Sequence, residues 1–172
     1  MKAIRISGIG ERLTQTHIAI PIPAAGEVLV AVRAAGICHS DAHYRSGIGS
    51  LRQLPITPGH EVAGIVESVG AGVSRERVGK RVCLHYLVTC GKCSYCRGKI
   101  GQFCPDVAMI GKDRDGGYAE YICVPEQNAF MAFLLARFRQ RAPARLDDSL
   151  RRLAESVFQH PVARIQRGQR FA

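Results

Sequence analysis

Four cysteines lie in a short run whose spacing is typical of a metal site. In "TCGKCSYCRGKIGQFCP", residues 89–105, gaps of two, two and seven residues separate Cys90, Cys93, Cys96 and Cys104. Two-residue gaps let thiolates converge on one ion, and the longer gap lets the loop close back over it. Zinc accepts four thiolates in a tetrahedron, which leaves no position open for a substrate. The spacing therefore predicts a structural zinc that stabilises a lobe of the protein.

Two other interpretations of this run are weaker. Two-cluster ferredoxins also begin with Cys-x2-Cys-x2-Cys and end in Cys-Pro, as Cys104-Pro105 does here, but their last gap is much shorter and they need a second set of four cysteines. Disulfides are disfavoured by the odd total of seven cysteines and by the expected cytoplasmic location, where thiols stay reduced. That location is expected because no signal-peptide-like segment or membrane-spanning apolar stretch is found.

A second set of reactive residues lies upstream of the cysteine run. The stretches "GICHSDAHYRSG" (36–47) and "TPGHEVAG" (57–64) contain Cys38 and His60, two candidate zinc ligands, with Glu61 adjacent. Each is weak evidence by itself, because a lone cysteine after an apolar strand, or a lone histidine, is usually a packed residue. Their position upstream of the four-cysteine run makes them stronger candidates.

The elements that must position these residues are predicted to be short strands. Alternating apolar residues and frequent glycines and prolines indicate a mainly β fold with short helices, either a barrel or a sandwich. Cys83 and Cys123 fall in strands and are expected to be buried. The predicted strands begin at "KAIRI" and continue at 27–37, 61–73, 80–86 and 117–124, with one helix at 39–46.

The composition changes after residue 128. Residues 129–172 contain nine arginines and three acidic residues, so they carry +6 of the net charge of +10. Helical periodicity at 128–141 and 146–159 predicts an Arg-rich tail that is helical or disordered and separate from a domain at 1–128. Such a tail could bind nucleic acid or an acidic partner, but it lacks the interleaved aromatic residues of single-strand binders, so nucleic acid is not the expected partner.

Residues 1 to about 130 resemble the N-terminal catalytic domain of the zinc-dependent medium-chain alcohol dehydrogenases. The resemblance rests on five ordered motifs: "AAGICHSDAH", "PITPGHEVAGIVESVGAGV", "VGKRV", "CGKCSYCRGKIGQFC" and "DGGYAEYICVP". It implies a GroES-like β-barrel that holds a catalytic zinc and a structural zinc.

The resemblance also implies a role for each residue of the two sets. Cys38 and His60 match catalytic-zinc ligands, and Glu61 matches a carboxylate that can approach or bind the same metal. Asp41 matches an acid that orients the ligand histidine. The remaining matches are Ser40 and His43 to a proton relay, His39 to a residue that faces the cofactor's phosphates, and Cys90, Cys93, Cys96 and Cys104 to the structural-zinc ligands.

The implied reaction is the oxidation of a primary or secondary alcohol by NAD(P). Zinc lowers the pKa of the alcohol oxygen, Ser40 passes the proton to His43, and hydride goes to the nicotinamide. The expected partners are a small alcohol or aldehyde and either a second copy of the chain or a chain that carries a Rossmann domain.

Two departures from the family lower the activity expected of the chain alone. No G-x-G-x-x-G follows a predicted strand, so the NAD(P)-binding Rossmann domain is missing. No cysteine follows Cys123, so the family's third firm catalytic ligand is also missing. The sequence therefore predicts a truncated alcohol dehydrogenase that is weakly active or inactive by itself. The alternative is a non-catalytic, zinc-stabilised barrel.

Overall fold

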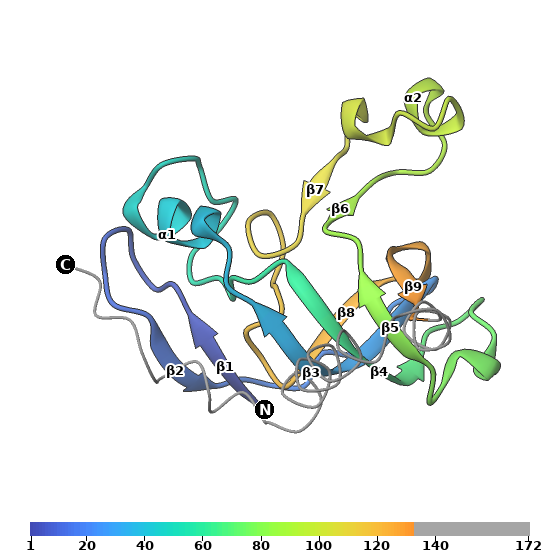
Figure 1. Ribbon diagram of the computed structural model, residues 1–172, viewed down its shortest axis with the longest axis horizontal. Coiled ribbons are helices and arrows are strands. Elements are labelled where there is room, and N and C mark those ends of the chain that lie inside the picture. The colour runs from blue at the N-terminus through green and yellow to red at the C-terminus, as the bar shows by residue number, and fades with distance from the viewer. Residues whose placement is uncertain (133–172) are drawn as a thin grey trace, which may run out of the picture.

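The computed structural model describes residues 1–132. Its largest element is an antiparallel sheet of five strands in the order β8-β3-β4-β5-β9 (Figure 1). The central strands β3 and β4 pair along most of their length, from Val28 opposite Val69 to Gly36 opposite Glu61. The strands of this sheet are β3 (Glu27–Gly36), β4 (Glu61–Val69), β5 (Arg81–Leu84), β8 (Tyr121–Pro125) and β9 (Ala129–Met131).

The core of the domain lies against the middle of this sheet. Val28 and Val30 are fully buried, as the alternating pattern of β3 predicts. Leu29 and Ala31, which point to the opposite face, are also buried. The centre of β3 is therefore covered on both faces, which an alternating pattern alone does not reveal. The core cluster also takes side chains from the other strands and the loops, chiefly Val66, Val82, Ile110, Ile122 and Val124.

Smaller elements extend from the sheet. Strands β1 (Lys2–Arg5) and β2 (Thr14–His17) form a separate antiparallel pair. A lobe projects away from the rest of the domain (Figure 1), joined to it through the two-residue strands β6 (Leu87–Val88) and β7 (Ala108–Met109). The lobe contains α2 (Ser94–Arg97) and the 3-10 turn η2 (Gly101–Phe103); the other 3-10 turns are η1 (Arg75–Arg77) and η3 (Glu126–Asn128).

Helix α1 (His39–Ser46) follows β3 directly and has the bounds that the sequence predicts. At its start, the carboxylate of Asp41 accepts a hydrogen bond from the backbone N–H of Cys38 at 3.1 Å. The helix ends at Gly47, whose φ of 89° is a left-handed conformation that favours glycine. The contact of Asp41 with Cys38 fixes where the helix begins, and Gly47 fixes where it ends. The start of the helix in turn places the Cys38 side chain.

The predicted mainly β class is confirmed, and so are the strands expected at 27–37, 61–73, 80–86 and 117–124, most with shorter bounds. The hydrogen-bonded order of the large sheet is open, with β8 and β9 at its edges, so the closed barrel stays a prediction. No helix within residues 1–132 is long and apolar enough to cross a membrane.

Two expectations are wrong. The helix predicted over 128–141 fails at residues 129–131, which form strand β9, because β5 offers a pairing edge that brings Met131 opposite Val82. Residues 129–131, where the predicted tail begins, therefore belong to the sheet. Residues 133–172 of the predicted tail lie outside the described residues. Cys83 was expected to be buried but is exposed, because it points away from the core face that holds Val82.

Candidate metal centres

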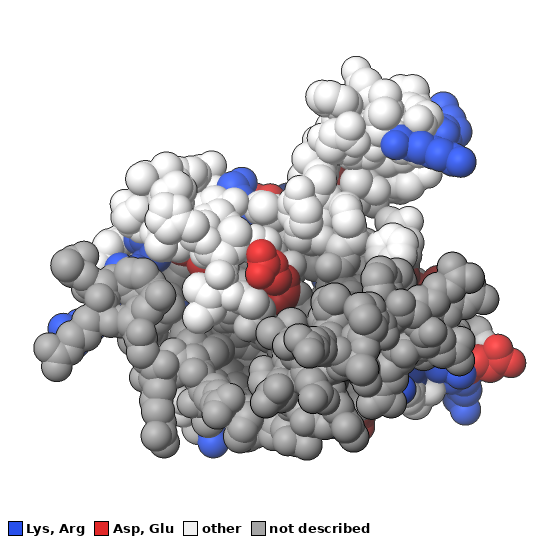
Figure 2. Space-filling view, viewed as in Figure 1, with Lys and Arg blue, Asp and Glu red and all other residues white. Residues whose placement is uncertain are grey.

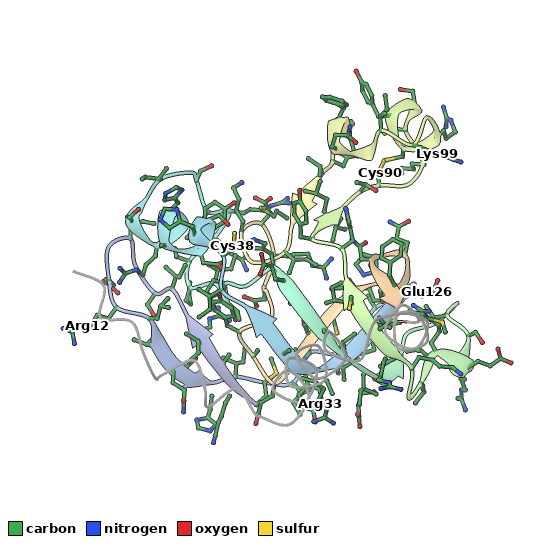
Figure 3. All side chains as sticks on the ribbon, viewed as in Figure 1. Arg12, Arg33, Cys38, Cys90, Lys99 and Glu126 are labelled. Atoms are coloured by element: carbon green, nitrogen blue, oxygen red, sulfur yellow. The ribbon has the colours of Figure 1, made fainter. Side chains whose placement is uncertain are left out.

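Two groups of candidate metal ligands converge within residues 1–132. In each group, one ligand atom per residue lies within 4.8 Å of the others. The groups are separate in space: Cys90 lies in the projecting lobe, whereas Cys38 lies beside α1 at the end of the sheet (Figure 3). The two groups are Cys90, Cys93, Cys96 and Cys104, and Cys38, His60 and Glu61.

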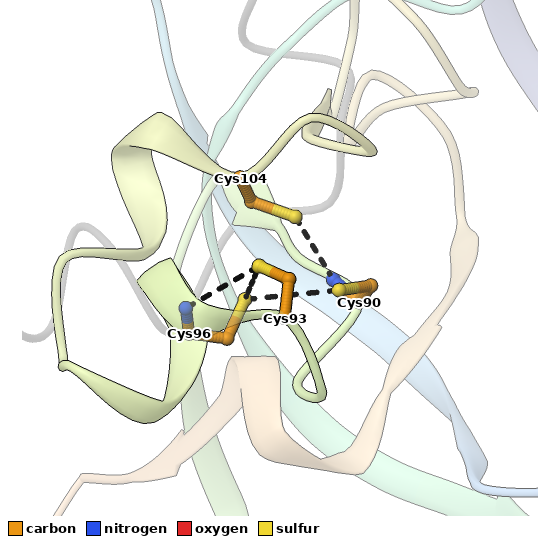
Figure 4. A group of neighbouring side chains, drawn as sticks. All are labelled: Cys90, Cys93, Cys96 and Cys104. Atoms are coloured by element: carbon orange, nitrogen blue, oxygen red, sulfur yellow. Dashed lines mark hydrogen bonds between the residues drawn. The ribbon is translucent and has the colours of Figure 1, made fainter.

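The four cysteine sulfurs of the lobe have the spacing of a single tetrahedral ion (Figure 4). Sγ of Cys96 lies 3.4 Å from Sγ of Cys93 and 3.9 Å from Sγ of Cys90. Four sulfurs bound to one zinc stand about 3.8 Å apart, whereas a disulfide bond is only about 2.05 Å long. A [4Fe–4S] cluster binds each thiolate to a different iron and a [2Fe–2S] cluster binds two thiolates to each iron, so both hold some of the four sulfurs farther apart than the 4.8 Å found here. The geometry is therefore consistent with structural zinc and disfavours the disulfide and iron–sulfur alternatives.

Backbone N–H groups of the lobe point at the sulfurs. The N–H of Cys96 donates to Sγ of Cys93 at 3.4 Å, where Cys93 caps the start of α2. The N–H of Cys90 donates to Sγ of Cys104 at 3.5 Å. Gly91 turns the chain between the first two ligands with a φ of 71°, which a residue with a side chain rarely adopts. The fold of the loop therefore directs the sulfurs inward.

These contacts shift the thiol pKa values. Hydrogen bonds from the backbone N–H groups of Lys92 and Cys93 lower the pKa of Cys90 to about 6. Burial raises the pKa of Cys96, but hydrogen bonds from Cys93 and Thr89 outweigh it, so that pKa is also lowered. At Cys104 a backbone hydrogen bond from Cys90 favours the thiolate, yet burial and the neighbouring thiols raise the pKa to about 11. Part of the site is therefore ready to bind a cation as thiolate.

Basic residues accompany this site in the lobe. Figure 2 shows Lys and Arg gathered at the end of the lobe, and the lobe segment 89–105 contains Lys92, Arg97 and Lys99 but no acidic residue. A zinc ion with four thiolates has a net charge of about −2. The three basic residues therefore offset the negative charge that such a metal site would have. This offset explains why the lobe segment is basic.

The second group is built where β3 leaves the sheet and β4 enters it. Cys38 follows β3 and caps α1, while His60 precedes β4 and Glu61 begins it. The register pairs Gly36 with Glu61, so the two segments meet at this edge of the sheet. A Cβ at residue 36 would lie 2.1 Å from Oε2 of Glu61, so the carboxylate of Glu61 lies directly beside Gly36.

The two ring nitrogens of His60 face different partners. Ser40 donates from Oγ to Sγ of Cys38 at 3.2 Å, and the same Oγ lies 3.4 Å from Nε2 of His60. Nδ1 of His60 lies 3.5 Å from Oδ1 of Asp41, without the alignment of a hydrogen bond. Nε2 is therefore the nitrogen on the Cys38 side, and Nδ1 is the one that faces the carboxylate of Asp41. A sulfur, an imidazole nitrogen and a carboxylate together are a donor set that suits zinc.

Asp41 is the centre of a buried hydrogen-bond network. Besides Cys38, the N–H of Gly59 donates to it at 3.2 Å and the hydroxyl of Tyr118 donates to it at 2.8 Å. Burial and the bond to Asp41 raise the pKa of the Tyr118 phenol far above its ordinary value. The sequence does not single out Tyr118, because nothing in "GGYAEY" distinguishes a hydrogen-bonding tyrosine from a packed one.

The predicted relay and cofactor residues are only partly brought together. The rings of His39 and His43, one helical turn apart, meet edge to face with centroids 4.5 Å apart. Within residues 1–132 no hydrogen bond joins Ser40 to the ring of His43. Their assigned roles therefore stay predictions.

A cleft of about 580 Å³ opens beside the second group. His60 and Glu61 lie in its wall, so a ligand in the cleft would contact the candidate metal centre. The volume is in the range of small-molecule sites. Most of the remaining lining is apolar and includes Val62, Ala63, Cys83, Leu84, Tyr86 and Met109.

Comparison with known proteins agrees with this geometry. Residues 24–133 match the alcohol dehydrogenase GroES-like domain family. The chain is 41% identical over 133 residues to an NAD-dependent alcohol dehydrogenase of Saccharolobus solfataricus, covering 73% of this chain and 38% of that protein. The chain therefore spans less than half the length of this curated relative, and 33% of another.

Solved structures give the same result. The short chain alcohol dehydrogenase RspB of Escherichia coli CFT073, complexed with NADH, is 40% identical with a TM-score of 0.71, covering 76% of this chain and 38% of that one. The cobalt- and zinc-bound thermostable alcohol dehydrogenase of Pyrobaculum aerophilum is 35% identical with a TM-score of 0.73, covering 77% and 41%. The fold similarity thus extends over 76–77% of the chain.

Proposed function

The chain belongs to the zinc-dependent medium-chain alcohol dehydrogenase family through its GroES-like domain, and from this premise we propose that it provides the metal-binding half of an alcohol dehydrogenase. The reaction is oxidation of a primary or secondary alcohol with NAD(P) as hydride acceptor. One observation carries the proposal: Cys38, His60 and Glu61 converge, and His60 and Glu61 lie in the wall of a cleft. The NAD-dependent and zinc-bound relatives support it.

The residues at this centre have separable tasks. Cys38, His60 and Glu61 would hold a zinc ion, which supplies Lewis-acid polarisation of an alcohol oxygen when bound. Asp41 orients the ring of His60 from its far side. The apolar wall of the cleft, with Leu84 and Met109, contacts the carbon part of a small alcohol.

Proton transfer uses Ser40 first. Its Oγ lies between Sγ of Cys38 and Nε2 of His60, where it can accept a proton from a ligand held at the centre. Because no hydrogen bond within residues 1–132 links Ser40 to His43, passing the proton outward needs an intermediate carrier such as water. His43 then serves as the final acceptor, since an imidazole titrates near neutral pH, and His39 contacts the phosphates of the cofactor.

The 172-residue chain alone is proposed to be weakly active or inactive. Residues 1–132 are mainly β and include no parallel sheet of the kind that binds a dinucleotide. A second polypeptide that carries a Rossmann domain would supply the nicotinamide site in a cytoplasmic complex. The closed barrel is part of the same proposal.

A second candidate function is a non-catalytic, zinc-stabilised domain. The closed four-cysteine site favours it, because that site needs no substrate or cofactor. Under this alternative Cys38 and His60 would bind no metal, although the lobe would. Metal stoichiometry therefore distinguishes the two candidates.

The test combines zinc analysis with NADH binding on the purified 172-residue chain. We expect one tightly held zinc and a second, weaker equivalent that is lost in His60→Ala but kept in His17→Ala, a histidine on the exposed β2. NADH fluorescence should detect very weak binding or none. A chain that holds one zinc and never a second would favour the non-catalytic candidate. Micromolar NADH binding would contradict the proposed need for a second polypeptide.

A further inference from the structure

Tyr118 is a buried residue whose hydroxyl faces the carboxylate of Asp41. Its side chain belongs to a residue that is only 2% exposed, and its hydroxyl donates to Oδ2 of Asp41 at 2.8 Å while lying 3.1 Å from the carbonyl oxygen of Gly36. Burial and the bond to Asp41 keep the pKa of this phenol high, so the hydroxyl is a donor at every working pH. A buried hydrogen bond to a charged acceptor is of the strong kind.

The other oxygen of Asp41 faces the histidine. Oδ1 accepts from the N–H of Gly59 at 3.2 Å and lies 3.5 Å from Nδ1 of His60. Because a carboxylate is planar and rigid, the partner of one oxygen determines where the other oxygen points. The hydroxyl of Tyr118, together with the N–H of Cys38, which also donates to Oδ2 at 3.1 Å, therefore fixes the direction from which Asp41 approaches His60.

Tyr118 also contacts both segments that carry the candidate ligands. Its N–H donates to the carbonyl of Pro58 at 3.0 Å, two residues before His60. A Cβ placed on Gly59 would lie 2.4 Å from the ring of Tyr118, so the ring packs directly on that backbone. On the other side, the hydroxyl reaches Gly36, two residues before Cys38.

From these contacts we propose that Tyr118 is a positioning residue of the metal centre, which orients the ligand His60 through Asp41. The inference rests on the proposed function, because it requires that a metal binds Cys38 and His60. Tyr118→Phe keeps the packed ring and removes only the hydroxyl, so this variant separates orientation from packing. Tyr121→Phe is the matched control, since its hydroxyl makes no hydrogen bond within residues 1–132.

The experiment is a Co²⁺ titration of the full 172-residue chain after zinc has filled the four-cysteine site. Binding is followed by the visible absorption of Co²⁺ and by the thiolate-to-cobalt charge-transfer band of Cys38, which Cys38→Ser should abolish. Loss of a residue that orients a metal ligand weakens metal binding about tenfold or more. We therefore expect Tyr118→Phe to lower the Co²⁺ affinity about tenfold and Tyr121→Phe to leave it unchanged.

A second background tests whether Tyr118 acts through Asp41. When Asp41→Asn is already present, adding Tyr118→Phe should lower the Co²⁺ affinity by no more than about twofold further, because the two residues share one interaction. An equal loss in both backgrounds would overturn the proposal, as would a Tyr118→Phe chain that fails to fold, which would make the hydroxyl structural.

The outcomes separate this inference from the proposed function. If the wild-type chain shows no Co²⁺ band that depends on Cys38, the metal centre is absent and both proposals fail. If the wild-type chain binds Co²⁺ and Tyr118→Phe binds it equally well, only the positioning role of Tyr118 fails.

Discussion

The Oγ of Ser40 lies 3.4 Å from Nε2 of His60, although the two residues are 20 positions apart in the chain. Helix α1 places Ser40 there because the helix starts directly after Cys38, and the first turn therefore returns over the cysteine sulfur. A hydroxyl in this position contacts both candidate ligands without belonging to the ligand set. These contacts support the proposed role of Ser40 in proton transfer.

Ser40→Ala should therefore separate metal binding from proton transfer. The variant keeps the sulfur of Cys38 and the ring of His60, so the second metal equivalent should bind as before. Alcohol oxidation, measured after a nucleotide-binding partner is supplied, should fall about 100-fold or more, because positioned acid–base groups contribute that much. Ser46→Ala, at the exposed end of the same helix, is the control. Unchanged turnover in Ser40→Ala would remove the residue from the relay.

Cys93→Ser should release the zinc of the lobe. A tetrahedral thiolate site needs all four ligands, and the metal replaces the apolar core that this short, glycine-containing loop lacks. We expect metal analysis to show about one equivalent less zinc per chain, together with a lower melting temperature. Cys83→Ser, in an exposed strand position, should retain the metal. Equal zinc content in the two variants would refute the structural-zinc assignment.

The sequence predicts the four-cysteine cluster more directly than it predicts the group formed by Cys38 and His60. The gaps between Cys90, Cys93, Cys96 and Cys104 are local, and four thiolates on one ion have few alternatives, so spacing alone indicates the site. Cys38 and His60 are brought together by the pairing of Gly36 with Glu61. No spacing rule gives that register, and only the family resemblance predicts that Cys38 and His60 meet.

The failures of prediction have a common physical cause. Residues 129–131 have an apolar composition that suits either a helix or a strand, and the free edge of β5 decides in favour of the strand. Tyr118 lies 77 positions from Asp41, so their hydrogen bond depends on tertiary packing. Strand β9 and the Tyr118–Asp41 hydrogen bond both depend on which distant segment of the chain packs beside these residues. A local sequence pattern does not contain that information.

His43→Ala should leave the stability of the domain nearly unchanged. The ring of His43 makes no hydrogen bond within residues 1–132, and its aromatic contact is with His39 in the preceding turn. Substitutions at such positions usually change the free energy of unfolding by less than about 0.5 kcal/mol. Asp41→Ala, in the same helix, leaves buried donors unpaired and should lower it by about 1–3 kcal/mol. Denaturant titrations that rank the two variants the other way would contradict this.

Ile110→Ala should lower the free energy of unfolding by about 2–5 kcal/mol, because it leaves a cavity in a fully buried part of the core. Ile22→Ala removes the same atoms from a residue that is 89% exposed, so its melting temperature should match that of the parent chain. Comparable losses in both variants would mean that Ile110 does not belong to the core around β3.

Gly59→Ala tests whether the backbone before His60 is held against Tyr118. Gly59 and Gly72 both have left-handed backbones, with φ values of 94° and 82°, so an alanine is strained by about 1 kcal/mol at either position. Only at Gly59 would the new methyl group meet other atoms, at 2.4 Å from the ring of Tyr118. A fully buried aromatic ring cannot move aside as an exposed side chain can.

Gly59→Ala should therefore lower stability by clearly more than Gly72→Ala and should also weaken Co²⁺ binding at Cys38 and His60. Gly72→Ala should show only the shared backbone strain and normal metal affinity. The comparison uses thermal unfolding for stability and the cobalt absorption for the site. If the two variants melt at the same temperature, the ring of Tyr118 does not pack on Gly59. If Gly59→Ala is destabilised but binds Co²⁺ normally, the segment before His60 can shift without moving the ligand.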